Sequence, residues 1–150
     1  VNSKGKFNVP VGRYVNPNIV NKENLFEVSK VLQSKDVSIK CQDFEDALKG
    51  VGHGDFVYLD PPYQLVSSTA SFTSYTESDF DFSDQKRLCA KFKALDKKGV
   101  KVLLSNSKSD EIVKLFKEFS DGIIEINANR FINSVSQKRT GHTELLIKNY

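Results

Sequence analysis

One short stretch of the sequence places a carboxylate, two prolines and an aromatic ring directly after an apolar run. The run is Phe-Val-Tyr-Leu at residues 56–59, and it is followed by Asp60, Pro61, Pro62 and Tyr63. Prolines lack an N–H group, and Pro62 restricts the residue before it to extended conformations, so a strand over 56–59 must end here. Ligands bind at the carboxyl ends of strands in open α/β sheets. This stretch is therefore the first candidate for a functional site.

These groups suit the transfer of a methyl group to an exocyclic amino nitrogen. Such a nitrogen is a poor nucleophile because its lone pair is delocalised into the ring. The Asp60 carboxylate and the Pro61 carbonyl can accept its two N–H bonds, which draws the lone pair out of conjugation. Tyr63 can stack on the base, a contact worth about 1–3 kcal/mol. A Pro-Pro turn after a strand can also occur without any function.

Two other clusters are better explained by local structure. The sequence Gly-Val-Gly-His-Gly at 50–54 ends a predicted helix and enters a strand, whereas a dinucleotide-binding loop follows a strand and opens a helix. The acids at 77, 79, 81 and 84 surround a predicted helix start, where the helix dipole favours them. Their spacing does not match a calcium loop. We therefore predict no metal site.

The elements that must position Asp60 follow from hydrophobic periodicity and capping residues. A capping box at 24–27 is predicted to open the first helix, a short helix covers 43–48, Ser83 caps the next helix and Gly99 ends it, and Ser109 caps the last. Strands are predicted over 37–41, 55–59, 100–104, 122–126 and 143–147. Residues 56–59 are expected to be buried on both faces because they are continuously apolar. The alternation predicts an α/β fold, mostly parallel, with an antiparallel C-terminal strand pair.

Composition limits the class of protein. The chain has 150 residues, 39% of them hydrophobic, which is enough for one core. A net charge of +3 permits a nucleic-acid partner without arguing for one. Cys41 and Cys89 fit no disulfide framework or metal spacing, and no apolar run approaches membrane-spanning length. Because the chain contains no methionine, we expect it to be a piece of a longer protein.

Several stretches together resemble Dam-type DNA N6-adenine methyltransferases. They are DPPY at 60–63, NSKGKFNVPVGRY at 2–14, SSTASFTSY at 67–75, LLSNS at 103–107 and RFINSVSQKRTGHTELLI at 130–147. DPPY alone is shared with cytosine-N4 enzymes, whereas its combination with FNVPVGRY is highly specific. The resemblance implies a partial Rossmann-like methyltransferase sheet. It also implies that residues 1–24 end a target-recognition region and that residues 25–150 are the C-terminal part of the catalytic domain.

The resemblance assigns roles to individual residues. Asp60 and the Pro61 carbonyl would hold the target amino group, with Pro62 completing the catalytic signature, and Tyr63 would stack on the flipped adenine. Asp43 and Phe44, together with Asp60, would contact S-adenosylmethionine. The implied contacts with double-stranded DNA are Lys4, Arg13, Arg130, Asn133 and Arg139. The implied target is GATC, in the cytoplasm and nucleoid of a bacterium or phage host.

The family's N-terminal region, with its Phe-x-Gly-Gly cofactor loop, is missing from this sequence. We therefore expect the 150-residue chain alone to be catalytically inert and to self-associate through strand edges left without partners. Two alternatives stay open. One is a protein or RNA N-methyltransferase with a related signature, which does not explain FNVPVGRY. The other is a DNA-binding remnant without activity.

Overall fold

The computed structural model describes residues 5, 15, 20–64, 80–128 and 142–150. The chain divides into two compact units, Val1–Cys41 and Gln42–Tyr150. The hairpin expected within residues 1–24 lies largely outside the described residues. The loop at 67–75 and the basic link at 130–141 lie wholly outside them.

In the first unit, helix α1 (Lys22–Leu32) begins earlier than its predicted capping box. The cap is Asn21, whose side-chain oxygen accepts a hydrogen bond from the Asn24 backbone at 3.3 Å. Glu27 does not reach back to the helix start, because its carboxylate pairs with Lys30 at 2.6 Å. The predicted capping box at 24–27 is therefore wrong by one turn.

The strand predicted over 37–41 is also wrong. These residues adopt no regular secondary structure, and Ile39 leaves 75% of its surface exposed. A strand persists only where a neighbouring strand pairs with its backbone groups, and residues 37–41 are not among the four strands of the sheet.

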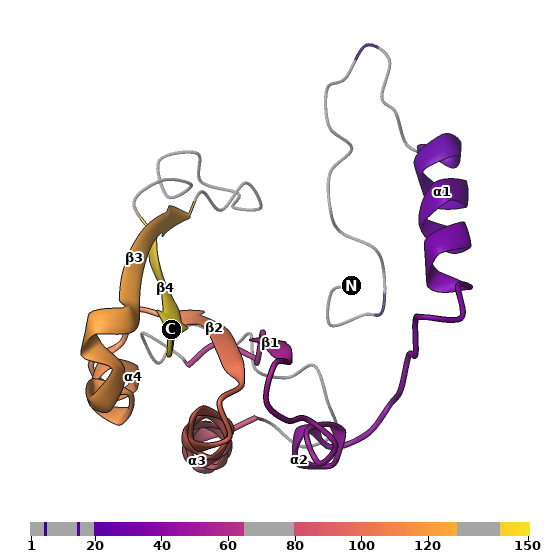
Figure 1. The fold of residues 1–150 in the computed structure, drawn as a ribbon. Coiled ribbons are helices and arrows are strands. Elements are labelled where there is room, and N and C mark those ends of the chain that lie inside the picture. Colours follow the sequence, from indigo (N-terminus) through magenta and orange to yellow (C-terminus); the bar gives the residue numbers. More distant parts are fainter. Residues whose placement is uncertain (1–4, 6–14, 16–19, 65–79, 129–141) are drawn as a thin grey trace. The chain divides into compact units, whose positions relative to one another are not determined.

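Within the described residues, the second unit contains a four-stranded mixed sheet in the order β1-β2-β4-β3. The strands are β1 (Phe56–Leu59), β2 (Lys101–Ser107), β3 (Ile123–Ala128) and β4 (His142–Lys148). Strands β1 and β2 are parallel, whereas β4 is antiparallel to both β2 and β3. The α/β class and the antiparallel C-terminal pair are thus confirmed (Figure 1). Among the described strands, β1 and β2 form the parallel pair.

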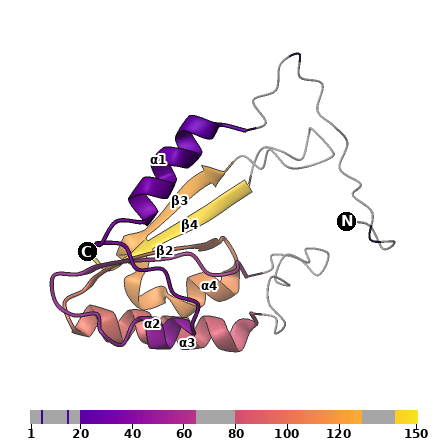
Figure 2. The same cartoon turned by 90° about the vertical axis from the view of Figure 1, so that its right-hand side faces the viewer.

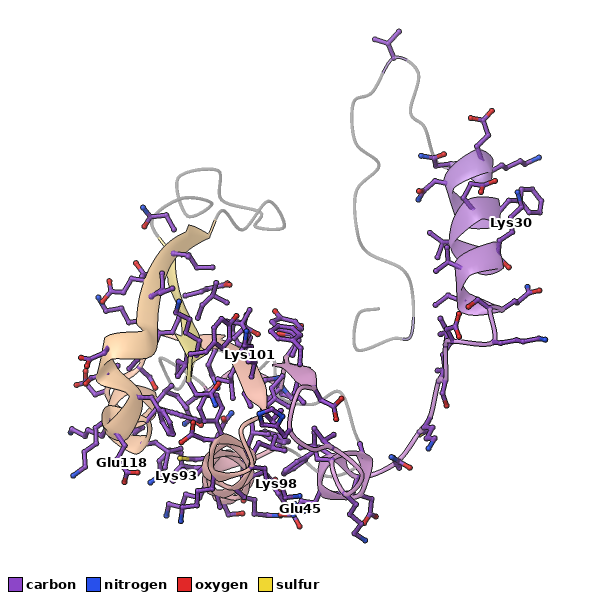
Figure 3. All side chains as sticks on the ribbon, in the orientation of Figure 1. Lys30, Glu45, Lys93, Lys98, Lys101 and Glu118 are labelled. Carbon is purple, nitrogen blue, oxygen red and sulfur yellow. The ribbon has the colours of Figure 1, made fainter. Side chains whose placement is uncertain are left out.

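Helices of the second unit pack on one face of this sheet (Figure 2). They are α2 (Phe44–Ala47), α3 (Phe82–Lys97), α4 (Asp110–Leu115) and the 3-10 helix η1 (Lys117–Gly122). The core consists of Val57, Leu59, Leu88, Cys89, Phe92, Leu95, Val100, Val102, Leu104, Ile112, Phe116, Leu145 and Ile147. Lys93 of α3 and Glu118 of η1 form an ion pair of 2.7 Å at the rim of this layer (Figure 3).

Strand β1 is buried on one face, not on both as its apolar run suggested. Val57 and Leu59 face the helices, whereas Phe56 and Tyr58 are 57% and 53% exposed. The physical reason is that successive side chains of a strand point to opposite faces. Helices α3 and α4 supply neighbours for only one of those faces among the described residues.

The boundaries of α3 follow from its caps. Asp81, not Ser83, is the N-cap, because its carboxylate accepts hydrogen bonds from the backbones of Ser83 and Asp84 at 2.6 and 3.2 Å. The prediction for Ser83 is therefore wrong by two residues. Gly99 follows the helix with φ of +71°, the left-handed conformation that glycine adopts freely, as predicted.

Candidate active site

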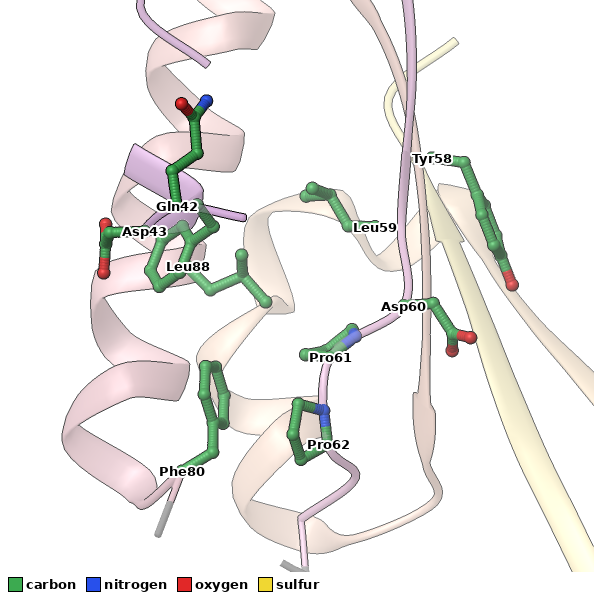
Figure 4. Close-up of a pocket in the computed structure, with 10 residues that line it drawn as sticks. Gln42, Asp43, Tyr58, Leu59, Asp60, Pro61, Pro62, Phe80 and Leu88 are labelled. Carbon is green, nitrogen blue, oxygen red and sulfur yellow. The ribbon is translucent and has the colours of Figure 1, made fainter. Parts of the chain in front are cut away.

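The carboxylate of Asp60 is held by the neighbouring strand. The Ser105 hydroxyl on β2 donates a hydrogen bond of 2.6 Å to Asp60 Oδ1. Ser105 is buried, whereas Asp60 is exposed. Figure 4 shows Asp60 and Tyr58 projecting on the side opposite Leu59. One oxygen of the carboxylate is thus anchored, and the group faces the side of the sheet away from the helices.

Tyr63 lies partly buried beyond the two prolines. Its hydroxyl donates to Glu144 Oε2 on β4 at 3.4 Å. Burial raises the pKa of Tyr63 above its ordinary value, and the negative charges of Glu144 and Asp60 act in the same direction, while a hydrogen bond with Ser105 opposes them. The phenol therefore stays neutral at physiological pH.

A pocket of about 360 Å³ surrounds the end of β1. Sites for small molecules commonly enclose about 300–1,000 Å³. The pocket brings together residues that sequence reasoning had placed in two separate groups, the signature and the expected cofactor pair. Its lining includes Asp60, Pro61, Pro62, Asp43, Phe44, Phe80 and Leu88 (Figure 4), whereas Tyr63 is not part of it.

Asp43 and Phe44 occupy the start of α2. The Asp43 carboxylate caps this helix by accepting from the Glu45 backbone at 2.8 Å. That hydrogen bond, reinforced by Arg87, holds the pKa of Asp43 below its ordinary value. The Phe44 ring lies 6.2 Å from that of Phe80 in a tilted arrangement. A carboxylate and an aromatic ring thus stand side by side on one wall of the pocket.

Arg87 of α3 fixes α2 in place, a role that sequence reasoning missed. Its guanidinium pairs with Asp84 at 2.7 Å and with Asp43 at 3.2 Å, and it lies 4.9 Å from the centre of the Phe44 ring. These hydrogen bonds to carboxylates raise the pKa of Arg87. The spacing of three residues could have suggested the Asp84 contact, whereas Asp43 lies 44 residues away and no local pattern points to it.

Ser105, Asn106 and Gln85 were also missed. All three are buried. The sequence did contain a signal for Gln85. This polar residue lies on the same face of the helix as Leu88 and Phe92, where an apolar residue is expected. A polar side chain on the core face of a helix needs a specific partner.

The five predicted DNA-binding residues, Lys4, Arg13, Arg130, Asn133 and Arg139, lie outside the described residues. Within the described ranges, no group of three or more histidine, cysteine, aspartate or glutamate side chains could hold a metal ion. No helix in the described part of the chain has the length and apolar character needed to cross a bilayer.

Comparison with known proteins identifies the family of this chain. The sequence model of the family of D12 class N6 adenine-specific DNA methyltransferases matches residues 1–132. The chain belongs to this family. Membership agrees with the resemblance that the DPPY and FNVPVGRY stretches carry.

The relatives of this chain include proteins from a bacterium, an archaeon and a phage. The chain is 48% identical to the type II methyltransferase M1.LlaDCHI of Lactococcus lactis subsp. cremoris, over 100% of the chain and 52% of the relative. It is 49% identical to the type II methyltransferase M.MjaIII of Methanocaldococcus jannaschii, over 100% and 51%. It is 32% identical to the DNA N-6-adenine-methyltransferase of Escherichia phage P1, over 92% and 18%. The chain thus spans about half the length of the two type II methyltransferases.

Proposed function

We propose that this chain is the C-terminal part of a site-specific DNA adenine-N6 methyltransferase. In this proposal the enzyme transfers a methyl group from S-adenosylmethionine to an adenine flipped out of the duplex, within GATC. The observation that carries the proposal is the placement of Asp60 at the carboxyl end of β1, anchored by Ser105 and lining a pocket of suitable size. The family membership of residues 1–132 supports the reaction class, and GATC follows from the Dam-type resemblance.

The chemistry of the pocket lining fits the proposed cofactor. S-adenosylmethionine carries an adenine ring, hydroxyl and amino donors and a positive sulfonium centre. The pocket lining includes the aromatic residue Phe44, the apolar residue Leu88 and the acidic residue Asp43. Asp60 lies at its edge, with a carboxylate that projects on the side of β1 opposite Leu59. We assign Asp43 and Phe44 to the cofactor's adenine. When bound, the cofactor supplies an electrophilic methyl group.

The residues of the signature prepare the acceptor. The Asp60 carboxylate accepts one N–H of the target amino group and the Pro61 carbonyl accepts the other, which restores the nucleophilic lone pair of N6. Tyr63 stacks on the flipped adenine and excludes water from it. Stacking and two fixed acceptors supply orientation, which accounts for a large part of the advantage of an enzyme.

Further parts of the proposal concern partners and the role of each segment. Residues 1–24 end the target-recognition region and residues 25–150 belong to the catalytic domain. Double-stranded DNA is contacted by Lys4, Arg13, Arg130, Asn133 and Arg139. The 150-residue chain alone is inert and self-associates, and the full-length enzyme acts in the cytoplasm at the nucleoid of a bacterium or phage host.

The test uses Asp60→Ala in a full-length protein that contains this chain. Labelled S-adenosylmethionine is mixed with duplexes that contain GATC or, as a control, GTTC. We expect transfer to the GATC duplex alone and a loss of at least about 100-fold in the variant, with little change in DNA affinity because phosphate contacts dominate it. Turnover of Asp60→Ala within tenfold of wild type would overturn the proposed role.

The 150-residue chain is assayed beside the full-length protein, with and without the missing N-terminal segment added in trans. Transfer by the chain alone would overturn the proposal that it is inert.

A further inference from the structure

Two buried amide side chains meet beneath the DPPY segment. Gln85 of α3 and Asn106 of β2 are 1% and 0% exposed. Asn106 Nδ2 donates a hydrogen bond of 3.0 Å to Gln85 Oε1. Buried amides cost free energy unless their groups are satisfied, so the partners of the remaining groups show what this pair holds.

Those remaining groups bond to the backbone on either side of Tyr63. Gln85 Nε2 donates to the Pro62 carbonyl at 2.9 Å. On the other side, the Gln64 backbone N–H donates to Asn106 Oδ1 at 3.0 Å. The two side chains therefore close a bridge from the residue before Tyr63 to the residue after it.

The segment has other anchors, because Ser105 holds the Asp60 carboxylate and the Ser107 hydroxyl donates to the Gln64 carbonyl at 2.6 Å. The bridge differs from them in holding the backbone on both sides of Tyr63. Residues 60–64 form no regular secondary structure, and neither proline can donate a backbone hydrogen bond. Among hydrogen bonds between described residues, none ends on the Pro61 carbonyl, whereas the Pro62 carbonyl is occupied by Gln85. The bridge thus engages one proline carbonyl and leaves the other available.

The two faces of β2 hold different groups of the site. Ser105 and Asn106 are consecutive and therefore point to opposite faces of the sheet. Ser105 holds the Asp60 carboxylate on the face away from the helices, and Asn106 joins Gln85 on the face that α3 covers. The amides therefore contact the loop from behind and do not reach the side where the base would lie.

We propose that Gln85 and Asn106 are positioning residues that fix the backbone around Tyr63, so that its ring and the Pro61 carbonyl are set for the target adenine. This inference rests on the proposed function. Misplacing a catalytic group by about 1 Å can cost on the order of 100-fold in rate. Loss of the bridge should therefore lower kcat far more than it changes the KM for DNA.

The principal variant is Gln85→Met/Asn106→Leu in the full-length protein. It removes both amides at once, which avoids leaving one of them unpaired in the core. The Pro62 carbonyl and the Gln64 N–H lose their partners, so a loss of stability is expected and is measured. The matched control is Asn149→Leu, because Asn149 anchors the other end of β2 through the Val102 N–H at 2.7 Å and the Val100 carbonyl at 2.9 Å. Thermal unfolding of both variants measures how much folded protein is lost.

Two readouts are compared. The first is kcat and KM for methyl transfer, where we expect kcat to fall on the order of 100-fold in the double variant and less than about threefold in the control. The second is hydrogen exchange of a peptide covering 60–64, in which the prolines contribute no amide. The Gln64 amide should exchange faster in the double variant than in wild type.

The outcomes separate the two proposals. If wild type transfers no methyl group, the proposed function fails. The exchange rate of the Gln64 amide in the double variant and in wild type still tests whether the bridge fixes this backbone. If wild type is active and the double variant keeps kcat within twofold, the positioning role is overturned. A fall in kcat that matches Asn149→Leu would also overturn it, because a merely structural role predicts equal losses.

Discussion

Removing the Ser105 hydroxyl tests whether Asp60 must be held for methyl transfer. In Ser105→Ala the hydrogen bond of 2.6 Å to Asp60 Oδ1 is lost. A hydrogen bond to a charged group contributes about 1.5–3 kcal/mol. Because Asp60 is exposed, water replaces the hydroxyl in the folded state, and we expect the free energy of unfolding to fall by only about 1 kcal/mol.

The effect on the chemical step should be larger than the effect on stability. Water cannot hold the carboxylate in one orientation, so much of the 1.5–3 kcal/mol is lost from the transition state. Since about 1.4 kcal/mol corresponds to tenfold in rate, we expect methyl transfer to slow by roughly 10- to 100-fold. Ser105→Thr keeps a hydroxyl and should recover part of the rate.

The assay is single-turnover methyl transfer by the full-length protein, because product release can mask the chemical step in kcat. Ser109→Ala is the matched control. Its hydroxyl caps α4 by accepting from the Ile112 N–H at 3.2 Å, and its loss costs about 1 kcal/mol of stability without contact with Asp60. A rate for Ser105→Ala within twofold of wild type, or no slower than Ser109→Ala, would refute the reasoning.

Three further predictions concern the core, the cofactor wall and pH. Phe92→Ala should lower the free energy of unfolding by about 3–5 kcal/mol in urea titrations, because the ring is fully buried; a loss below 1 kcal/mol would contradict this packing. Arg87→Gln should weaken binding of S-adenosylmethionine several-fold in calorimetry, because Asp43 and α2 lose their tether; unchanged affinity would exclude that role. Lys93 lowers the pKa of Glu118 from 4.5, and Glu118 raises that of Lys93 from 10.5. The stabilising effect of the pair should therefore be lost as pH falls through the lowered Glu118 value and as it rises through the raised Lys93 value. Glu118→Gln should match wild type in unfolding free energy at both extremes and be less stable between them, and a constant difference across pH would argue against the ion pair.

Local signals in the sequence predicted the elements that carry the site. The apolar run before Asp60 predicted β1, and the Ser109 cap and Gly99 placed helix ends where the structure has them. Such signals predict structure from sequence because a cap or a glycine acts on backbone groups within one helical turn of itself. The strand over 37–41 failed for the complementary reason, since a strand depends on a partner elsewhere in the chain.

The sequence by itself determined that a carboxylate, two proline carbonyls and an aromatic ring follow the end of a strand, because two adjacent prolines permit little else. It also determined the family, through stretches whose order is specific. Only the tertiary structure decided which residues hold those groups. Ser105 reaches Asp60, and Gln85 reaches Pro62, across separations of 45 and 23 residues. Those contacts depend on the register that pairs Leu59 with Leu104 and on the packing of α3 against the sheet, and neither is a property of any local segment.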